Sequence, residues 1–171
     1  MSTSNLSPTN QPGYFQVYID QVKEKQLAEA FTQQSMEIKT LLPSISEEKS
    51  MYSYATAKWT LREIVQHLID SERIFTYRAL CFARKDTALL PGFDENDYAV
   101  VSNANTRSWE SLSAEFVAVR RSTLFLFNSF SAAMLDSKGI ANNNTFSVTE
   151  LGFIIIGHFS HHKKIMEERY F

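Results

Sequence analysis

The chain has 171 residues, enough for one domain with a sizeable core. Hydrophobic residues make up 44% of it and charged residues 21%, which excludes a largely disordered protein. Its 17 basic and 19 acidic residues give a net charge of −2, so nucleic acid and anionic lipid exert no general electrostatic attraction. We expect one domain over residues 13–171 after a polar, disordered tail over residues 1–12.

Two further features bear on where the protein works. The longest uninterrupted apolar stretch is short, running from Phe153 to Ile156, and the N-terminus has neither a basic nor an apolar region. The single cysteine, Cys81, has no intramolecular partner and is best explained as a small buried side chain. We therefore expect a cytoplasmic protein with no secretory signal, no membrane association and no nucleic-acid partner.

Four amphipathic segments are predicted to be helices. Apolar residues recur at three- and four-residue spacing from Tyr14 to Leu42, where Pro43 ends the pattern, and a break near Lys23 to Lys25 remains open. The same periodicity predicts helices over about Leu61–Ala83, Ser108–Phe130 and Val148–Tyr170. We find no strand pair with hairpin turn residues and no internal repeat, so the predicted fold is an all-α four-helix bundle.

Two of the helix starts carry a specific signal. Thr60 and Glu63 follow Trp59, and Ser147 and Glu150 follow Phe146 in the same way. A hydroxyl residue three positions before a glutamate is a capping box, and the preceding aromatic residue can act as a hydrophobic staple. We therefore expect both helices to begin at these residues.

The connections between the predicted helices are long. They span Pro43 to Trp59, about Arg84 to Arg107 and about Ser131 to Phe146, whereas closely paired antiparallel helices use about two to eight residues. Such loops either cross an end of the bundle or shape a site there. The middle one contains Leu89 to Tyr98, which mixes turn residues, acids and aromatics, and we interpret it as a lid or rim.

All four histidines lie on the two helices with capping boxes: His67 on one, and His158, His161 and His162 on the other. His158 and His162 are four residues apart, so both imidazoles can face one ion inside the bundle, and His67 also lies on an apolar face. Buried histidines without any metal remain an alternative. Gly157 is costly in a helix interior and suggests a packing or site requirement, while His161 is expected at the flank.

Three segments of the chain resemble the DinB-like (DNA-damage-inducible) superfamily, which includes bacillithiol transferase-like proteins. They are KWTLREIVQHLIDSERIFTYRAL at Lys58 to Leu80, LPGFDENDYA at Leu90 to Ala99 and GHFSHHKKIMEERY at Gly157 to Tyr170. The resemblance implies a four-helix bundle whose second and third helices follow a mirrored order. The family name refers to induction by DNA damage and does not imply DNA binding.

The resemblance also implies a metal site. His67, His158 and His162 match the positions that hold a divalent ion in the family, and Zn²⁺, Ni²⁺ and Mn²⁺ all accept such ligands. A three-histidine ion with an open position can generate hydroxide or bind a thiolate. The implied activity is transfer of a low-molecular-weight thiol, or a related transferase or hydrolase reaction on a small molecule.

Other residues around this site are harder to assign. Asp70 and Glu72 are candidates to orient a ligand or act as a base, with a solvated helix face as the alternative for each. Arg78 and Arg169 are candidates to receive a substrate carboxylate, and helix-end ion pairs explain them equally well. We expect the site mouth to be roofed by two aromatic residues, Phe93 and Tyr98.

Two further hypotheses remain open. The protein is either an enzyme or a non-catalytic, metal-binding stress-response bundle, and a metal-free helical scaffold is a weaker third possibility. Its 13 Phe and seven Tyr are more large apolar side chains than a bundle of this size easily buries. We therefore expect a homodimer that covers an apolar helical face.

Overall fold

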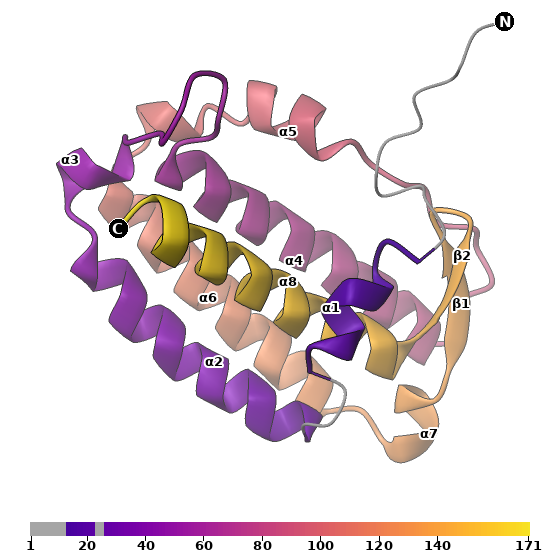
Figure 1. Ribbon diagram of the computed structural model, residues 1–171. Helices are drawn as coiled ribbons and strands as arrows, with labels where there is room; N and C mark the ends of the chain where they lie inside the picture. Colours follow the sequence, from indigo (N-terminus) through magenta and orange to yellow (C-terminus); the bar gives the residue numbers. More distant parts are fainter. Residues whose placement is uncertain (1–12, 23–25) are drawn as a thin grey trace, which may run out of the picture.

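The computed structural model describes residues 13–22 and 26–171, and the expected tail over residues 1–12 lies outside them. The described part is all-α apart from one small hairpin, and four long helices form a bundle (Figure 1). These are α2 (Leu27–Leu41), α4 (Leu61–Ala83), α6 (Trp109–Asn128) and α8 (Val148–Arg169). The shorter helices are α1 (Gln16–Asp20), α3 (Glu47–Ser50), α5 (Glu95–Val101) and α7 (Ala132–Leu135).

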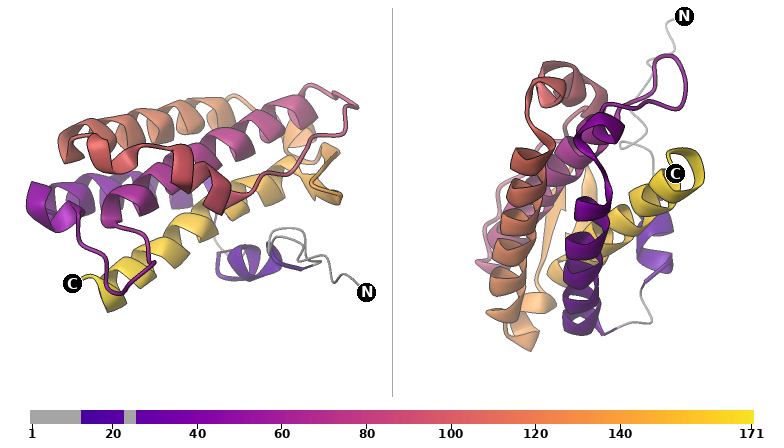
Figure 2. Two further views of the ribbon diagram at one scale, coloured as in Figure 1. Left: turned by 90° about the horizontal axis from the view of Figure 1, so that it is seen from above. Right: turned by 90° about the vertical axis from the view of Figure 1, so that its left-hand side faces the viewer.

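The order of the helices around the bundle differs from that of a simple up-and-down bundle. α4 packs against α6 and α8, and α2 packs against the same two helices, so the ring order is α2, α6, α4, α8 (Figure 2). The second and third long helices have thus exchanged places relative to chain order, as the resemblance implied. The connections from α2 to α4 and from α6 to α8 must each cross a diagonal, which explains their length.

Both predicted capping boxes form. The Thr60 Oγ1 accepts a hydrogen bond from the Glu63 backbone N–H at 3.2 Å, and a Glu63 carboxylate oxygen accepts one from the Thr60 N–H at 2.7 Å. Ser147 and Glu150 repeat this arrangement at 3.1 and 2.6 Å. Local sequence therefore fixes where α4 and α8 begin. These two helices carry all four histidines.

The segment from Tyr14 to Leu42 does not form one continuous helix. α1 ends at Asp20 and packs across α8, whereas α2 begins at Leu27 and belongs to the bundle; the suggested break at residues 23–25 falls outside the described residues. The close approach of α1 depends on Gly157. A Cβ at that position would lie 2.2 Å from the Tyr18 carbonyl oxygen, so only glycine lets the two backbones touch.

The expectation of no hairpin is also wrong. β1 (Lys138–Ala141) and β2 (Asn144–Ser147) pair antiparallel within the segment that we predicted to be a plain connection. The two residues between them, Asn142 and Asn143, have φ values of 50° and 59°. Left-handed backbone at both central positions is typical of a type I′ turn, which suits the twist of paired strands, and asparagine tolerates it.

Two apolar clusters make up the core, and a polar network lies where they meet. The Arg120 guanidinium on α6 donates to both Glu72 carboxylate oxygens on α4, at 2.8–3.1 Å, and to the Gln34 side-chain carbonyl on α2 at 2.9 Å. Gln34 in turn donates to the Ile156 carbonyl oxygen on α8 at 2.8 Å. One buried network therefore joins all four helices. Aromatic rings lie against the guanidinium: Phe31, Phe116 and Phe159.

Two further points concern the single cysteine and membrane-spanning helices. Cys81 is buried, as predicted, within the apolar cluster that includes Phe82 and Ala83. Within the described residues, none of the helices has the length and apolar character that crossing a bilayer would need.

Candidate metal centre

Three imidazoles from two neighbouring helices converge in the bundle. The Nε2 atoms of His67 on α4 and His158 on α8 lie 2.9 Å apart, and His162 lies one turn along α8 from His158. Taking one ring nitrogen from each of the three residues, these atoms all lie within 4.8 Å of one another. The exchange of helix positions is what makes α4 and α8 neighbours, so the mirrored order is what brings His67 to the other two.

The spacing of these nitrogens fits a bound ion. Imidazole nitrogens lie about 2.0–2.1 Å from Zn²⁺, so two ligands at a tetrahedral angle are separated by about 3.4 Å. The Nε2 atoms of His67 and His158 lie 2.9 Å apart, so they would need to move apart by only about half an ångström to bind one ion. The three residues could therefore hold one divalent ion with little rearrangement of their side chains.

The electrostatics of the cluster favour neutral imidazoles. Burial, with a smaller contribution from His161, lowers the pKa of His67 to about 4. Burial also lowers the pKa of His158 and His162 well below the ordinary value, and the neighbouring histidines add to the effect. A neutral imidazole keeps a nitrogen lone pair available, which is the form that binds a metal.

His161 takes the flanking position that the helix geometry predicted. Its ring lies 5.2 Å from that of His162 and 5.5 Å from that of Tyr18, and it is only half-buried. It lines the same cavity but is not one of the three residues whose nitrogens cluster.

The cavity over the three imidazoles is small, at about 120 Å³, and mostly aromatic. Trp59 packs against His67 with ring centroids 5.0 Å apart, and Tyr18 packs against His158 at 5.4 Å. The other walls come from the residues just before α1, from α4, from the loop before α5 and from the start of α5, through Tyr14, Phe15, Ser71, Phe75, Phe93 and Glu95. These rings shield the imidazoles from bulk solvent and leave space only for the reacting end of a molecule.

The predicted aromatic roof is half correct. Phe93 lines the cavity, whereas Tyr98 does not and instead packs against Phe93 with ring centroids 5.2 Å apart. Several wall residues were missed, among them Tyr14, Tyr18 and Trp59. Periodicity assigned the two tyrosines to one long helix and gave no indication that α1 folds back over α8.

Neither carboxylate candidate lies in the cavity wall. Glu72 is only 3% exposed, and both of its carboxylate oxygens are bound by Arg120, so it belongs to the core network rather than to a solvated face. Asp70 accepts a hydrogen bond from Gln66 at 2.9 Å on a different side of α4. Neither side chain is among those that line the cavity of the three histidines.

The two arginine candidates also lie outside the cavity wall. The Arg78 guanidinium donates to the Pro91 carbonyl oxygen at 2.7 Å and lies against the rings of Phe75 and Phe93, so it anchors the segment before α5. Arg169 is exposed at the end of α8 and is not among the residues that line the cavity.

One carboxylate that the predictions did not single out does line the cavity. Glu95 is the first residue of α5, and its Oε2 atom is buried without a hydrogen-bond partner among the described residues. Its position in the acidic stretch Leu90 to Ala99, inside the expected lid, was the available signal.

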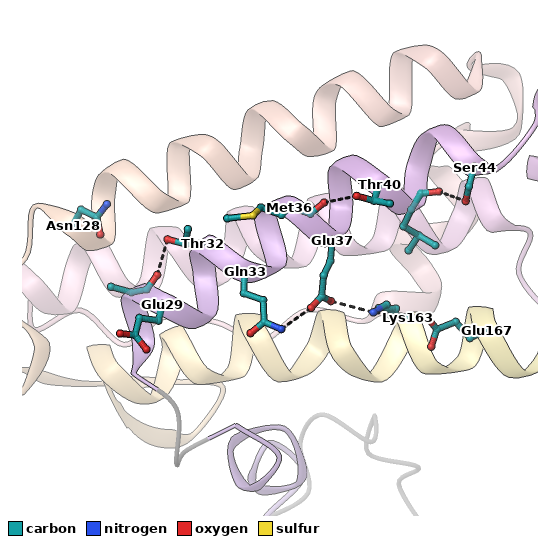
Figure 3. Close-up of a pocket in the computed structure, with 12 residues that line it drawn as sticks. Glu29, Thr32, Gln33, Met36, Glu37, Thr40, Ser44, Asn128, Lys163 and Glu167 are labelled. Carbon is teal, nitrogen blue, oxygen red and sulfur yellow. Dashed lines mark hydrogen bonds and ion pairs between the residues drawn. The ribbon is translucent and has the colours of Figure 1, made fainter.

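A larger groove lies along α2, away from the histidines (Figure 3). Glu37 binds Lys163 of α8 at 3.1 Å and accepts a hydrogen bond from Gln33 at 3.1 Å. The walls of this groove are mainly solvent-facing side chains of α2, and none of its lining residues belongs to the histidine cluster. Size alone therefore does not make this groove the candidate active site.

Comparisons with known proteins agree with this geometry. The model of the DinB superfamily matches residues 30–166, a range that contains His67, His158 and His162. No curated protein gives a significant match. Among solved structures, one described as "YfiT from Bacillus subtilis is a probable metal-dependent hydrolase with an unusual four-helix bundle topology" is similar, with a TM-score of 0.58 and 15% sequence identity. That alignment covers 98% of this chain and 92% of the other and supports the fold. Because the family match spans most of the chain, this protein belongs to the DinB superfamily.

Proposed function

We propose that the protein is a metal-dependent enzyme in which His67, His158 and His162 hold one divalent ion. The observation that carries the proposal is the convergence of three imidazoles, kept neutral by burial, on one small enclosed space. The family membership and the description of YfiT as a probable metal-dependent hydrolase point in the same direction. Zn²⁺, Ni²⁺ and Mn²⁺ all accept imidazole ligands, so any of the three is a candidate.

When bound, such an ion would act as a Lewis acid that stabilises an anionic oxygen or sulfur at its open position. The residues of this chain do the rest. His67 and His158 are held by tight packing between α4 and α8, so their nitrogens are already positioned. Trp59, Phe75 and Phe93 exclude water and confine the reacting end of the substrate.

We favour a low-molecular-weight thiol as the nucleophile and S-transfer to a small electrophile as the reaction. Sulfur is polarisable and makes favourable contacts with aromatic rings, which form most of this cavity. The volume of about 120 Å³ admits a thiol and the carbon next to it, while the bulk of either substrate remains outside. Hydrolysis by an activated water molecule is the related reaction that the same site allows.

The alternative is a non-catalytic, metal-binding stress-response bundle. The small cavity favours it, because full enclosure of a substrate of ordinary size would require about 300 Å³ or more. Tight metal binding together with no turnover of any thiol or ester substrate would support this alternative.

The deciding experiment pairs two measurements on protein purified without an affinity tag. Elemental analysis gives the metal content, and a screen of low-molecular-weight thiols against an aryl halide and an epoxide tests S-transfer, with aryl esters as the hydrolysis test. We expect one ion per chain and thiol-dependent turnover. Protein without any ion after dialysis against Zn²⁺, Ni²⁺ or Mn²⁺ would contradict the proposal.

We also propose that the protein works in the cytoplasm as a homodimer. Large apolar side chains are exposed on adjacent helices, with Tyr77 of α4 58% and Phe125 of α6 65% accessible. On α5, Val100 and Val101 are also exposed. Light scattering at micromolar concentration tests the dimer, and a monomer there would contradict it.

A further inference from the structure

Glu95 is half-buried and lines the histidine cavity, and one of its carboxylate oxygens is used by no other group in the described part of the chain. It lines the cavity with His67, His158 and His162, and its Oε2 is inaccessible to solvent and has no hydrogen-bond partner in the described part of the chain. A carboxylate buried without a donor is unfavourable, and an unused acceptor in a cavity is consistent with a role in binding a ligand.

The chain leading into Glu95 is held by hydrogen bonds to α4 and to the hairpin. Arg78 of α4 binds the Pro91 carbonyl oxygen, and Leu90 makes two backbone hydrogen bonds of 3.0 Å with β1 and the turn after it. At the start of α5, Asp94 caps the helix by accepting hydrogen bonds from the N–H groups of Asn96 and Asp97 at 2.8 and 3.2 Å. Glu95, directly after this cap, therefore sits on a rigid support.

Glu95 lies near the ligand cluster without belonging to it. The group of potential ligand atoms within 4.8 Å of one another comprises three imidazole nitrogens and no carboxylate oxygen. Tyr14, just before α1, lines the same cavity, and the charge of Glu95 adds to the effect of burial in raising the pKa of Tyr14. Glu95 thus shares the cavity with the imidazoles without joining their cluster, so a molecule bound there would meet its carboxylate.

We propose that Glu95 is the proton acceptor of this site and takes the proton of a thiol that binds beside the three histidines. The S–H bond breaks, its electron pair stays on sulfur as the thiolate, and the proton forms an O–H bond with Glu95 Oε2. This step needs no other reactant, and the same proton is available to the leaving group later. The inference rests on the proposed function.

A proton inventory tests this role without turnover. Calorimetric titration of the Zn²⁺-loaded protein with 2-mercaptoethanol, near neutral pH in buffers that differ in ionisation enthalpy, counts the protons released to solution. In the native protein we expect clearly fewer than in Glu95→Gln, because Glu95 holds part of the thiol proton. In Glu95→Gln we expect close to one, because the amide cannot accept it.

Asp97→Asn is the matched control, since it removes one carboxylate from an exposed position on the same helix. It should release as few protons as the native protein. Zn²⁺ affinity is measured for each variant and should change less than about threefold, which also shows that the site is folded. Glu95→Ala is the second variant and should behave like Glu95→Gln.

The possible failures are distinguishable. Equal proton release by the native protein and Glu95→Gln would overturn the role of Glu95 while leaving the metal site intact. Loss of Zn²⁺ binding in Glu95→Gln with retained helical structure would make Glu95 a ligand instead. A native protein that binds Zn²⁺ but no thiol would overturn the thiol step of the proposed function and this inference with it.

Discussion

The Nε2 atoms of His67 and His158 lie 2.9 Å apart, although 91 positions separate the two residues in the chain. In the absence of an ion, one of these nitrogens can donate a hydrogen bond to the other. A metal would replace that hydrogen bond with two coordinate bonds, so the site is nearly preorganised.

Single His→Ala substitutions should distinguish the three proposed metal ligands from His161. We expect His67→Ala, His158→Ala and His162→Ala each to weaken binding of Zn²⁺ by at least about a hundredfold, because two imidazoles remain. His161→Ala should change it by less than about tenfold, since His161 lies outside the cluster. Isothermal titration of all four variants measures this; loss of binding in His161→Ala with retention in His162→Ala would contradict it.

The metal-free protein should lose stability on mild acidification. Burial, with a smaller effect from His161, lowers the pKa of His67 from 6.5 to about 4, so between these values the unfolded chain binds more protons. The free energy of unfolding should therefore fall as pH falls through this window, by roughly 3 kcal/mol from His67 alone. His158 and His162, which are shifted in the same direction, should add to the loss.

Urea denaturation in the presence of a chelator, repeated across this pH range, measures the effect. His67→Asn has no imidazole to protonate at this position and should show a flatter pH dependence. Parallel curves for the native protein and the variant would show that the buried His67 does not resist protonation.

Gly157→Ala should weaken the packing of α1 on α8. Alanine in a helix interior is normally about 1 kcal/mol more favourable than glycine, but here its Cβ would meet the Tyr18 carbonyl oxygen at 2.2 Å. We expect a net loss of about 1–3 kcal/mol and faster hydrogen exchange in α1. Gly152→Ala is the comparison, because the contacts there are side-chain ends that can move. A Gly157→Ala protein more stable than the native one would disprove the close contact.

Arg120→Met should be strongly destabilising. It would leave the Glu72 carboxylate buried without its partner, and such an uncompensated charge costs about 3–5 kcal/mol. Changing Glu72 to Met as well should recover most of the loss, because the buried charge is then gone. Guanidinium denaturation of the two variants provides the measurement. A double variant no more stable than Arg120→Met would mean that packing, rather than charge, dominates at this position.

Loss of either N-cap should cost a smaller amount. Thr60→Ala and Ser147→Ala each remove a hydroxyl that accepts a hydrogen bond from the third residue of the helix, which is worth about 1 kcal/mol. Thermal denaturation measures the loss. Ser108→Ala offers a useful comparison, since Ser108 caps α6 in the same way but without a capping box.

Local sequence determined the parts of this protein that depend on residues near one another. The capping hydroxyls and glutamates set the starts of α4 and α8, and the apolar period set three of the four long helices, because hydrogen bonds and periodicity act within a few turns. The spacing of His158 and His162 already indicated that both face one direction. The resemblance added the pairing with His67 and the mirrored helix order.

Tertiary structure decided what depends on contacts between distant segments. Tyr18 reaches the site only because Gly157 lets α1 rest on α8, and periodicity cannot distinguish this from one continuous helix. Glu72 looked like a candidate base, yet Arg120, 48 residues away, binds it in the core. Glu95 faces the histidines because Arg78 and β1 hold its segment over the cavity. A side chain's neighbours across the fold, rather than its own type, therefore decide which carboxylate is available for chemistry.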